Sequence, residues 1–380
     1  MDAQATGEVL RYFQTMTDPR RHNRLHRLMD ILTIALFAVL AGAEGWVDVA
    51  EYGQRKLDWL KTFLELPYGI PSHDTFERVF ARLNPQEFEA CFLAWMASMV
   101  ELTGGKLVAI DGKSLRRSFE QGWDKSGMAH MVSAFVQANR MVFAQVKTDG
   151  KGHELDGISR LLELLDLNGA VVSIDAIACN ADIAGKILSA GGLYLLAVKE
   201  NQPTLHAKLK ATLDDAILDG FAGMSHDQDQ QTDGDHGRIE KRQLWVTWDV
   251  HLLGDLAKQW PALKSLVVIE RTRQVGSGSS GTVERHYYIS ALGRRTKAAK
   301  MAQYVRGHWS VENNLHWQLD VSFNEDQRRL RKGHGAENFS RLCRIALNLL
   351  KANKTIKNGI ANKRKCCGWD NDYLLTVVGQ

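Results

Sequence analysis

Residues 304–326, with the sequence YVRGHWSVENNLHWQLDVSFNED, decide how the rest of this chain is interpreted. The spacing predicts a helix, and its packable residues, which recur at helical intervals, are Trp309, Leu315 and Leu319. Glu312, His316 and Asp320 stand at positions i, i+4 and i+8, which places them on one stripe of that helix. An acidic stripe on an otherwise packable helix predicts partner groups elsewhere in the chain.

Two aspartates upstream supply those partners. Asp111 ends the apolar run KLVAID (106–111), and Asp175 ends the apolar run AVVSID (170–175). Each run is typical of a buried strand. Two strand-end aspartates and one helix-borne glutamate form a carboxylate set that can hold two divalent cations for phosphodiester chemistry. The sequence therefore makes Asp111, Asp175 and Glu312 the candidate catalytic and metal-binding residues.

The order of elements in residues 101–198 predicts an α/β fold with a ribonuclease-H-like catalytic domain. Strands are expected at 107–111, 131–137, 141–148, 170–175 and 193–198, with helices at 158–165 and 182–190. In that order the first and fourth strands end side by side, which brings Asp111 close to Asp175. Carboxylates so close repel one another, so we expect at least one of their pKa values to be raised when no metal is bound.

Three further parts are expected around the first part of this core. Residues 1–100 are predicted to be all helix, residues 199–295 to be a β-rich insertion, and residues 296–380 to complete the catalytic core with the Glu312 helix and a basic C-terminal helix. The insertion is expected to contain a helix from Pro203, a solvated loop at 226–237, and strands at 242–250, 265–273 and 285–292. The N-terminal helices, with arginines before them, fit a DNA-reading helix-turn-helix and a plain helical bundle equally well.

Charge is distributed unevenly along the chain. The net charge is only +4, yet the basic segment 328–365 carries twelve Lys or Arg residues and a single acid, Glu337. Apolar residues recur at helical spacing from Phe339 to Leu350, so we expect an amphipathic helix that offers its charge to a polyanion. The candidate DNA contacts at the start of this segment are Arg328, Arg329, Arg331 and Lys332.

Basic and aromatic residues also lie close in sequence to the carboxylates. Guanidinium groups pair with phosphates, and aromatic rings can stack on an unpaired base. The candidate DNA contacts of this kind are Lys113, Arg116, Arg238, Tyr304, Arg306, His308 and Trp309. His308, Glu312 and His316 share a stripe, but the HExxH spacing of a zinc protease is absent.

Composition excludes several classes of protein. The chain has 380 residues, of which 44% are hydrophobic, enough to bury a sizeable core. The longest apolar run, 31–43, is shorter than the roughly 18 residues that span a bilayer, so we expect a buried helix and no membrane partner. Five cysteines without a CxxC spacing predict neither a disulfide framework nor a zinc knuckle. A reducing cytoplasm is the expected location.

Several motifs resemble bacterial insertion-sequence transposases of the DDE superfamily, in the H-repeat-associated branch related to the insertion-sequence-four group. The helical part resembles that branch in DPRRHNRLHRLMDILTIALFAVLAGAEGW (18–46) and GIPSHDTFERVFARLNP (69–85). The catalytic part resembles it in AIDGKSLRRS, SIDAIACN, AVKENQP, HGRIEKR and GHWSVENNLHWQLDVSFNED.

The resemblance implies that Asp111, Asp175 and Glu312 form the DDE triad, with Mg²⁺ or Mn²⁺ as cofactor. It also implies double-stranded DNA as the partner, both at the element's terminal inverted repeats and at the target, together with a homodimer on DNA and a bacterial, nucleoid-associated protein. Candidate dimer surfaces are the apolar residues near Trp46 and Trp59 or along 242–250.

The resemblance has one departure and leaves three functions to compare. The wider group carries Tyr, Arg, Glu and Lys at fixed spacing on this helix, whereas this chain has His308 and Leu319 at the Arg and Lys positions. Release of DNA ends through a hairpin therefore stays open. The leading function is metal-dependent cleavage and strand transfer at insertion-sequence ends. The alternatives are a domesticated or degenerate nuclease that cuts without joining, and a non-catalytic DNA-binding protein.

Overall fold

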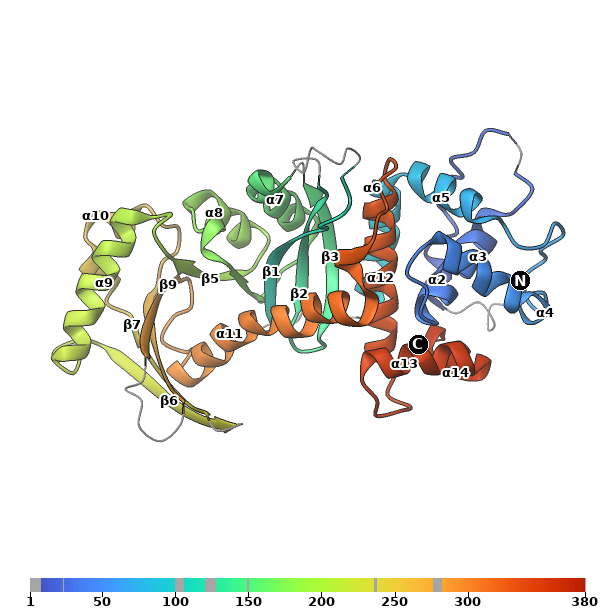
Figure 1. Ribbon diagram of the computed structural model, residues 1–380. Coiled ribbons are helices and arrows are strands. Elements are labelled where there is room, and N and C mark those ends of the chain that lie inside the picture. The colour runs from blue at the N-terminus through green and yellow to red at the C-terminus, as the bar shows by residue number, and fades with distance from the viewer. Residues whose placement is uncertain are drawn as a thin grey trace.

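The computed structural model describes residues 8–22, 24–99, 106–119, 128–148, 150–235, 238–275 and 282–379. Helices gather at one end of an elongated molecule, and strands run from its middle to its other end (Figure 1). Within the described residues, no helix is long and apolar enough to cross a membrane.

Helices from both ends of the chain build the helical end of the molecule. The helices before the first described strand are α1 (Glu8–Arg11), α2 (Leu28–Leu40), α3 (Trp46–Arg55), α4 (Leu57–Leu60), α5 (His73–Arg82) and α6 (Pro85–Met99). Those at the other end of the chain are α12 (Gly335–Ala352), α13 (Ile360–Trp369) and α14 (Asn371–Val378). Nearly every residue of α2 is buried, as the apolar run at 31–43 predicts, and α3, α12 and α13 pack against it. The C-terminal helices thus complete a helical layer that begins near residue 8.

A nine-stranded sheet with the order β3-β2-β1-β4-β5-β9-β8-β7-β6 runs through the rest of the described fold, which also contains the helices of residues 154–311. Its first five strands are β1 (Leu107–Ser114), β2 (His130–Val136), β3 (Met141–Thr148), β4 (Val171–Ile174) and β5 (Leu193–Val198). Strand β1 is antiparallel to β2 and parallel to β4, and β4 is parallel to β5. Helices α7 (Glu154–Leu164) and α8 (Ala181–Ser189) connect β3 to β4 and β4 to β5. These strands and their order agree with the sequence prediction.

The β-rich insertion extends the same sheet. After α9 (Pro203–Leu218), its strands are β6 (His226–Asp235), β7 (Arg238–Thr247), β8 (Ser265–Val275) and β9 (Thr282–Ser290), and β9 pairs with β5. The short helix α10 (Asp255–Lys258) lies between β7 and β8. The prediction of a solvated loop at 226–237 is wrong over residues 226–235, because these ten residues pair with β7 as an edge strand; residues 236–237 lie outside the described residues. The stretch 226–235 has no apolar side chain, so backbone pairing with β7 is what makes it a strand.

Helix α11 (Ala298–Val311) carries the 304–326 segment onto the sheet. It packs against β1, β4, β6 and β7, and Figure 1 shows it crossing from the insertion toward the centre of the sheet. A Cβ atom on Gly307 would lie 2.3 Å from the end of the Leu107 side chain, so any larger residue here would require Leu107 to shift. After Val311 the helix widens into two π-helical turns, Glu312–His316 and Gln318–Ser322. The prediction of a helix is confirmed, but its expected regular spacing of 3.6 residues per turn is wrong over residues 312–322.

Candidate active site

Asp111 and Asp175 lie where the parallel ladder between β1 and β4 ends. The last paired residues of that ladder are Ile110 and Ile174, so both aspartates follow at the same edge. They line one cavity of about 260 Å³. The expectation that these two strands end side by side is confirmed, although 64 positions separate the aspartates in the sequence.

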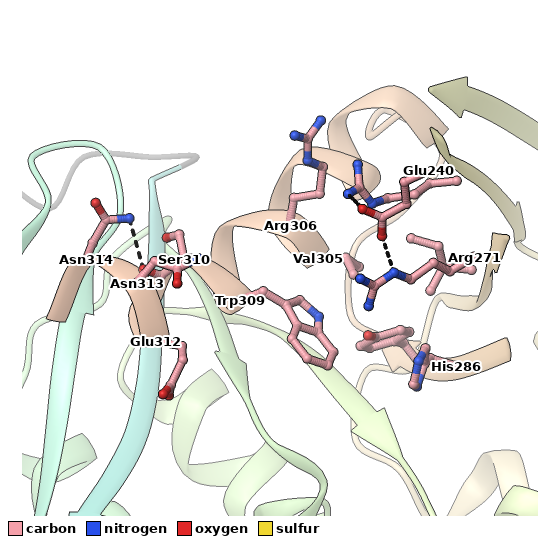
Figure 2. Close-up of a pocket in the computed structure, with 13 residues that line it drawn as sticks. Glu240, Arg271, His286, Val305, Arg306, Trp309, Ser310, Glu312, Asn313 and Asn314 are labelled. Atoms are coloured by element: carbon pink, nitrogen blue, oxygen red, sulfur yellow. Dashed lines mark hydrogen bonds and ion pairs between the residues drawn. The ribbon is translucent and has the colours of Figure 1, made fainter. Parts of the chain in front are cut away.

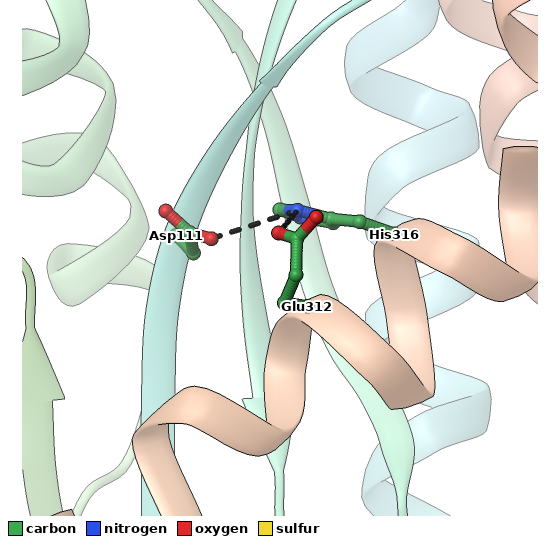
Figure 3. A group of neighbouring side chains, drawn as sticks. All are labelled: Asp111, Glu312 and His316. Carbon is green, nitrogen blue, oxygen red and sulfur yellow. Dashed lines mark hydrogen bonds and ion pairs between the residues drawn. The ribbon is translucent and has the colours of Figure 1, made fainter. Parts of the chain in front are cut away.

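Glu312 and His316 approach Asp111 from the first π-helical turn, as Figure 3 shows. His316 Nδ1 lies 3.2 Å from Glu312 Oε2 and 3.6 Å from Asp111 Oδ2. The candidate ligand atoms of these three residues all lie within 4.8 Å of one another. The His316 side chain is 9% exposed and that of Glu312 is 73% exposed. Sequence reasoning placed His316 on the acidic stripe but assigned it no role at the site.

Asp111 is the carboxylate whose ionisation the site opposes most. Burial raises its pKa to about 6, and the negative charges of Asp175 and Glu312 add to the rise, whereas the Gly112 backbone N–H lowers it. The expected rise of at least one carboxyl pKa is therefore confirmed at Asp111. Burial lowers the pKa of His316, and the Glu312 carboxylate opposes that change.

Asp175 has a different environment. Its Oδ1 accepts a hydrogen bond from the Ala176 backbone N–H at 2.7 Å and lies 3.1 Å from Lys199 Nζ. Burial raises its pKa, but these two partners outweigh burial, so the net pKa is lower than usual. Asp175 is consequently ionised and half exposed beside the tighter group formed by Asp111, Glu312 and His316.

The donor atoms fit a hard divalent cation. Carboxylate oxygens are the ligands that suit Mg²⁺ and Mn²⁺, and Asp111 and Glu312 supply them. A cation between Asp111 and Glu312 would remove the repulsion that raises the pKa of Asp111. Asp111, Glu312 and His316 could hold one ion, and Asp175 stands at the same edge for a second.

The basic residues beside the carboxylates differ in how far solvent reaches them. Lys113 Nζ lies 2.7 Å from Asp320 Oδ1 and 3.3 Å from Asp326 Oδ1, and its side chain is only 9% exposed. The charge of Lys113 is thus neutralised by two carboxylates of the protein itself. Arg116 is 76% exposed and lies 3.0 Å from Asp326 Oδ2, so it remains accessible. Arg238 begins β7, and its side chain lies outside the described part of the chain.

The candidates on α11 also separate into buried and exposed residues. Tyr304 is buried, which contradicts its predicted contact with DNA. Burial lowers the pKa of His308, whose ring lies in the small cavity that Asp175 and Lys199 line. Trp309 is 53% exposed and lines a second cavity of about 420 Å³ with Arg306 and Glu312, as Figure 2 shows. Arg306 faces this cavity too, and its Nη1 donates to Gln231 at 2.6 Å.

The basic segment 328–365 is divided between buried and exposed cations, which corrects its interpretation as one DNA-binding strip. Four of its cations are buried: Arg341, Arg344, Lys363 and Arg364. Arg344 Nη1 lies 2.6 Å from Glu325 Oε1, and Arg364 donates to the Val39 carbonyl at the end of α2. Glu325 and Val39 are distant in sequence from the arginines that they bind, so the charge pattern alone could not reveal these contacts.

The four residues proposed at the start of this segment are more accessible. Arg329 and Lys332 are exposed, and Lys332 Nζ lies 2.7 Å from Glu77 Oε2. The guanidinium carbon of Arg328 lies 4.4 Å from the centre of the Phe339 ring, and that of Arg331 lies 5.0 Å from the centre of the Phe119 ring. Both arginines are therefore partly covered.

The proposed dimer surfaces are mostly internal. Trp46 is buried and packs edge-on against Phe339 of α12, with 4.8 Å between ring centroids. Trp59 is partly buried and packs against the core, and Leu244, Trp245 and Val246 are buried in β7. Trp46 and the three β7 residues fill the protein's own core, whereas Trp59 is only partly buried and Val47, next to Trp46, is 65% exposed.

Comparisons with known proteins agree with this arrangement. The sequence profile described as "Transposase DDE domain" matches residues 102–349, and the profile described as "DDE_Tnp_1-associated" matches residues 10–96. "Putative transposase YncI" of Escherichia coli O157:H7 is 38% identical, and the match covers 97% of this chain and 94% of that protein. "H repeat-associated putative transposase YhhI" of Escherichia coli strain K12 is also 38% identical, over 93% of this chain and 92% of that protein.

One solved structure resembles the fold distantly. It is the piggyBac transposase synaptic complex with hairpin DNA, with a TM-score of 0.44 and 10% sequence identity over 98% of this chain and 78% of that chain. The two profile matches and the two relatives at 38% identity are the findings that assign the family. This chain belongs to the DDE transposase family and is a homologue of the H-repeat-associated transposases.

Proposed function

We propose that this protein cleaves DNA at the ends of its own insertion sequence and joins those ends to target DNA, with Asp111, Asp175 and Glu312 as catalytic, metal-binding residues. The observation that carries the proposal is the convergence of a strand-end carboxylate, Asp111, with Glu312 and His316 inside 4.8 Å. Asp175 at the same sheet edge supports it. Membership of the DDE transposase family points to the same chemistry.

The side chains divide the work by position. The negative charges of both Asp175 and Glu312 act on Asp111, so Asp111 is the residue suited to contact both cations. His316 supplies a nitrogen donor beside Glu312. Two bound Mg²⁺ or Mn²⁺ ions would activate the attacking oxygen and stabilise the leaving 3′ oxygen. Lys199 neutralises Asp175 when no cation is present.

The strand order supports a ribonuclease-H-like catalytic domain. Strands β1, β2 and β3 form an antiparallel meander, and α7, β4, α8 and β5 then add two parallel strands beside β1. Such a sheet places carboxylates from β1 and β4 at one edge. Helix α11 and its π-helical turns then bring Glu312 to that edge from a distant part of the chain.

Accessible basic and aromatic residues supply the DNA-binding surface in this proposal. They are Arg116, Arg306, Trp309, Arg329 and Lys332. The partly covered Arg331, and Arg238 at the start of β7, are further candidates. Trp309 and Arg306 line the larger cavity next to Glu312, which suits an unpaired nucleotide near the cutting site. The element's terminal inverted repeats and the target would be the two DNA partners, and a homodimer would hold both ends at a fixed distance.

Donor plasmids that carry the genomic DNA flanking the gene provide the test. The wild-type protein should cut at the element ends in Mg²⁺ or Mn²⁺, should not cut in EDTA, and should insert the ends into a second plasmid. Asp111→Ala should abolish cutting while DNA binding remains, and Asp255→Asn, which removes a 91% exposed carboxylate on α10, should cut normally. Cutting without insertion would identify a nuclease, and binding without cutting would identify a DNA-binding protein.

A further inference from the structure

Lys113 forms a second contact between the strand of Asp111 and the helix of Glu312. Residues 111 and 113 are two apart on β1, so their side chains leave the same face of the sheet. Asp111 faces the first π-helical turn through His316, and Lys113 faces Asp320 in the second turn at 2.7 Å. The strand and the helix are therefore joined at two successive positions.

These two positions have opposite electrostatics in the metal-free protein. Between Asp111 and Glu312 the charges repel, which contributes to the raised pKa of Asp111. Between Lys113 and Asp320 they attract, and both Asp320 oxygens lie within 2.8 Å of Lys113 Nζ. Burial raises the pKa of Asp320, and Lys113 opposes that rise. The second contact thus offsets a repulsion that would otherwise push the helix away from the strand.

Two acids at the end of this segment are paired as well, one with Lys113 and one with the helical layer. Asp326 lies 3.3 Å from Lys113 Nζ, and its side chain is 14% exposed. The neighbouring Glu325 is buried and paired with Arg344 of α12 at 2.6 Å. Residues 320–326 are consequently anchored to β1 by Lys113 and to the helical layer by Arg344.

We propose that Lys113 is a positioning residue, which holds the π-helical turns against β1 so that Glu312 faces Asp111 before a cation binds. The inference rests on the proposed metal-dependent function. It differs from the sequence prediction that Lys113 contacts DNA phosphate, since a side chain that is 9% exposed and paired with two carboxylates has little charge to offer a polyanion.

The sign of one measurement separates positioning from direct electrostatics. A lysine near a cation site repels the cation, so Coulomb's law alone predicts that Lys113→Met would bind Mn²⁺ more tightly than the wild type. Positioning predicts the reverse, because the separated carboxylates must be brought together at the expense of binding. Loss of a residue that orients metal ligands typically weakens metal affinity by about tenfold to a hundredfold.

The experiment measures Mn²⁺ binding to the full chain without DNA, from the electron paramagnetic resonance signal of free Mn²⁺. The variants are Lys113→Met, Asp320→Asn, the double variant, and Lys258→Met as the matched control, because Lys258 also pairs with an aspartate at 2.7 Å but lies exposed on α10. We expect at least about tenfold weaker binding for Lys113→Met, unchanged binding for Lys258→Met, and a double variant no weaker than Lys113→Met. Circular dichroism of each variant checks that the fold is retained, and Lys113→Gln, which also removes the positive charge, repeats the test should Lys113→Met not fold.

Three results would overturn the inference. Mn²⁺ affinity equal to or above that of the wild type in Lys113→Met would mean that the lysine does not position Glu312. Losses that add in the double variant would mean that Lys113 does not act through Asp320. No Mn²⁺ binding by the wild type would remove the proposed function itself and the inference with it, whereas wild-type binding with an unaffected Lys113→Met would remove the inference alone.

Discussion

Replacing Asp111 with Asn should stabilise the metal-free protein. Asn keeps the shape of Asp and can still accept the Gly112 N–H, which lies 2.9 Å from Asp111 Oδ1. The folded protein raises the pKa of Asp111 from 3.8 to about 6. A raised pKa means that the ionised carboxylate destabilises the folded state, and the substitution removes that carboxylate.

The magnitude follows from the size of the shift. About two pKa units correspond to about 3 kcal/mol at most, since each unit is worth about 1.4 kcal/mol. The Asp111 side chain is 32% exposed, and its remaining hydration reduces the expected gain to about 1 to 2 kcal/mol. The favourable contribution of a protonated Asp111 is present below pH 3.8 and is lost as the pH rises through about 6. The advantage of Asp111→Asn should therefore be full above that pH and vanish below pH 3.8.

Urea unfolding in EDTA near neutral pH is the assay, with Asp255→Asn as the control. Added Mg²⁺ should raise the unfolding midpoint of the wild type by preferential binding to the folded state and leave that of Asp111→Asn unchanged. A midpoint for Asp111→Asn at or below that of the wild type in EDTA would refute the account of a strained carboxylate group.

Three further outcomes are expected. Arg344→Met should lower the free energy of unfolding by about 3 to 5 kcal/mol, because it leaves Glu325 buried without its charged partner. The double variant Arg344→Met/Glu325→Gln should lower it less. Urea unfolding measures both losses, and equal losses would contradict the account of a buried ion pair. Arg329→Gln/Lys332→Gln should flatten the slope of log DNA affinity against log salt by about 2, as fluorescence anisotropy would detect, and an unchanged slope would mean that these residues do not contact phosphate. Trp309→Ala should weaken single-stranded DNA binding by about 1 to 3 kcal/mol, while Trp369→Ala, equally an exposed tryptophan, should bind as the wild type does.

The carboxylate site could be predicted because its parts have local signatures. Asp111 and Asp175 each follow an apolar strand, and the order of strands and helices places those strands side by side. Glu312 stands on a helix whose acidic stripe has no partner nearby in sequence. These features need no knowledge of distant contacts.

The rest depended on contacts between segments far apart in sequence. The buried charges of α12 and α13 find their partners at Glu325 and at the end of α2, so a run of Lys and Arg resembled a polyanion-binding surface. Strand β6 has polar residues throughout and becomes a strand only through pairing with β7. The place of His316 at the site depends on the π-helical turn that begins at Glu312, which residue spacing does not reveal.

Cleavage of element-end DNA by Glu312→Ala in Mg²⁺ tests the central claim most directly. Glu312 is the residue that joins the helix to the strand carboxylates, and the neighbouring acids Asp320 and Glu325 are already paired with Lys113 and Arg344. We expect this variant to fold and bind DNA but to lose cleavage, while Asp255→Asn cleaves as the wild type does. Full cleavage by Glu312→Ala would contradict the assignment of the active site.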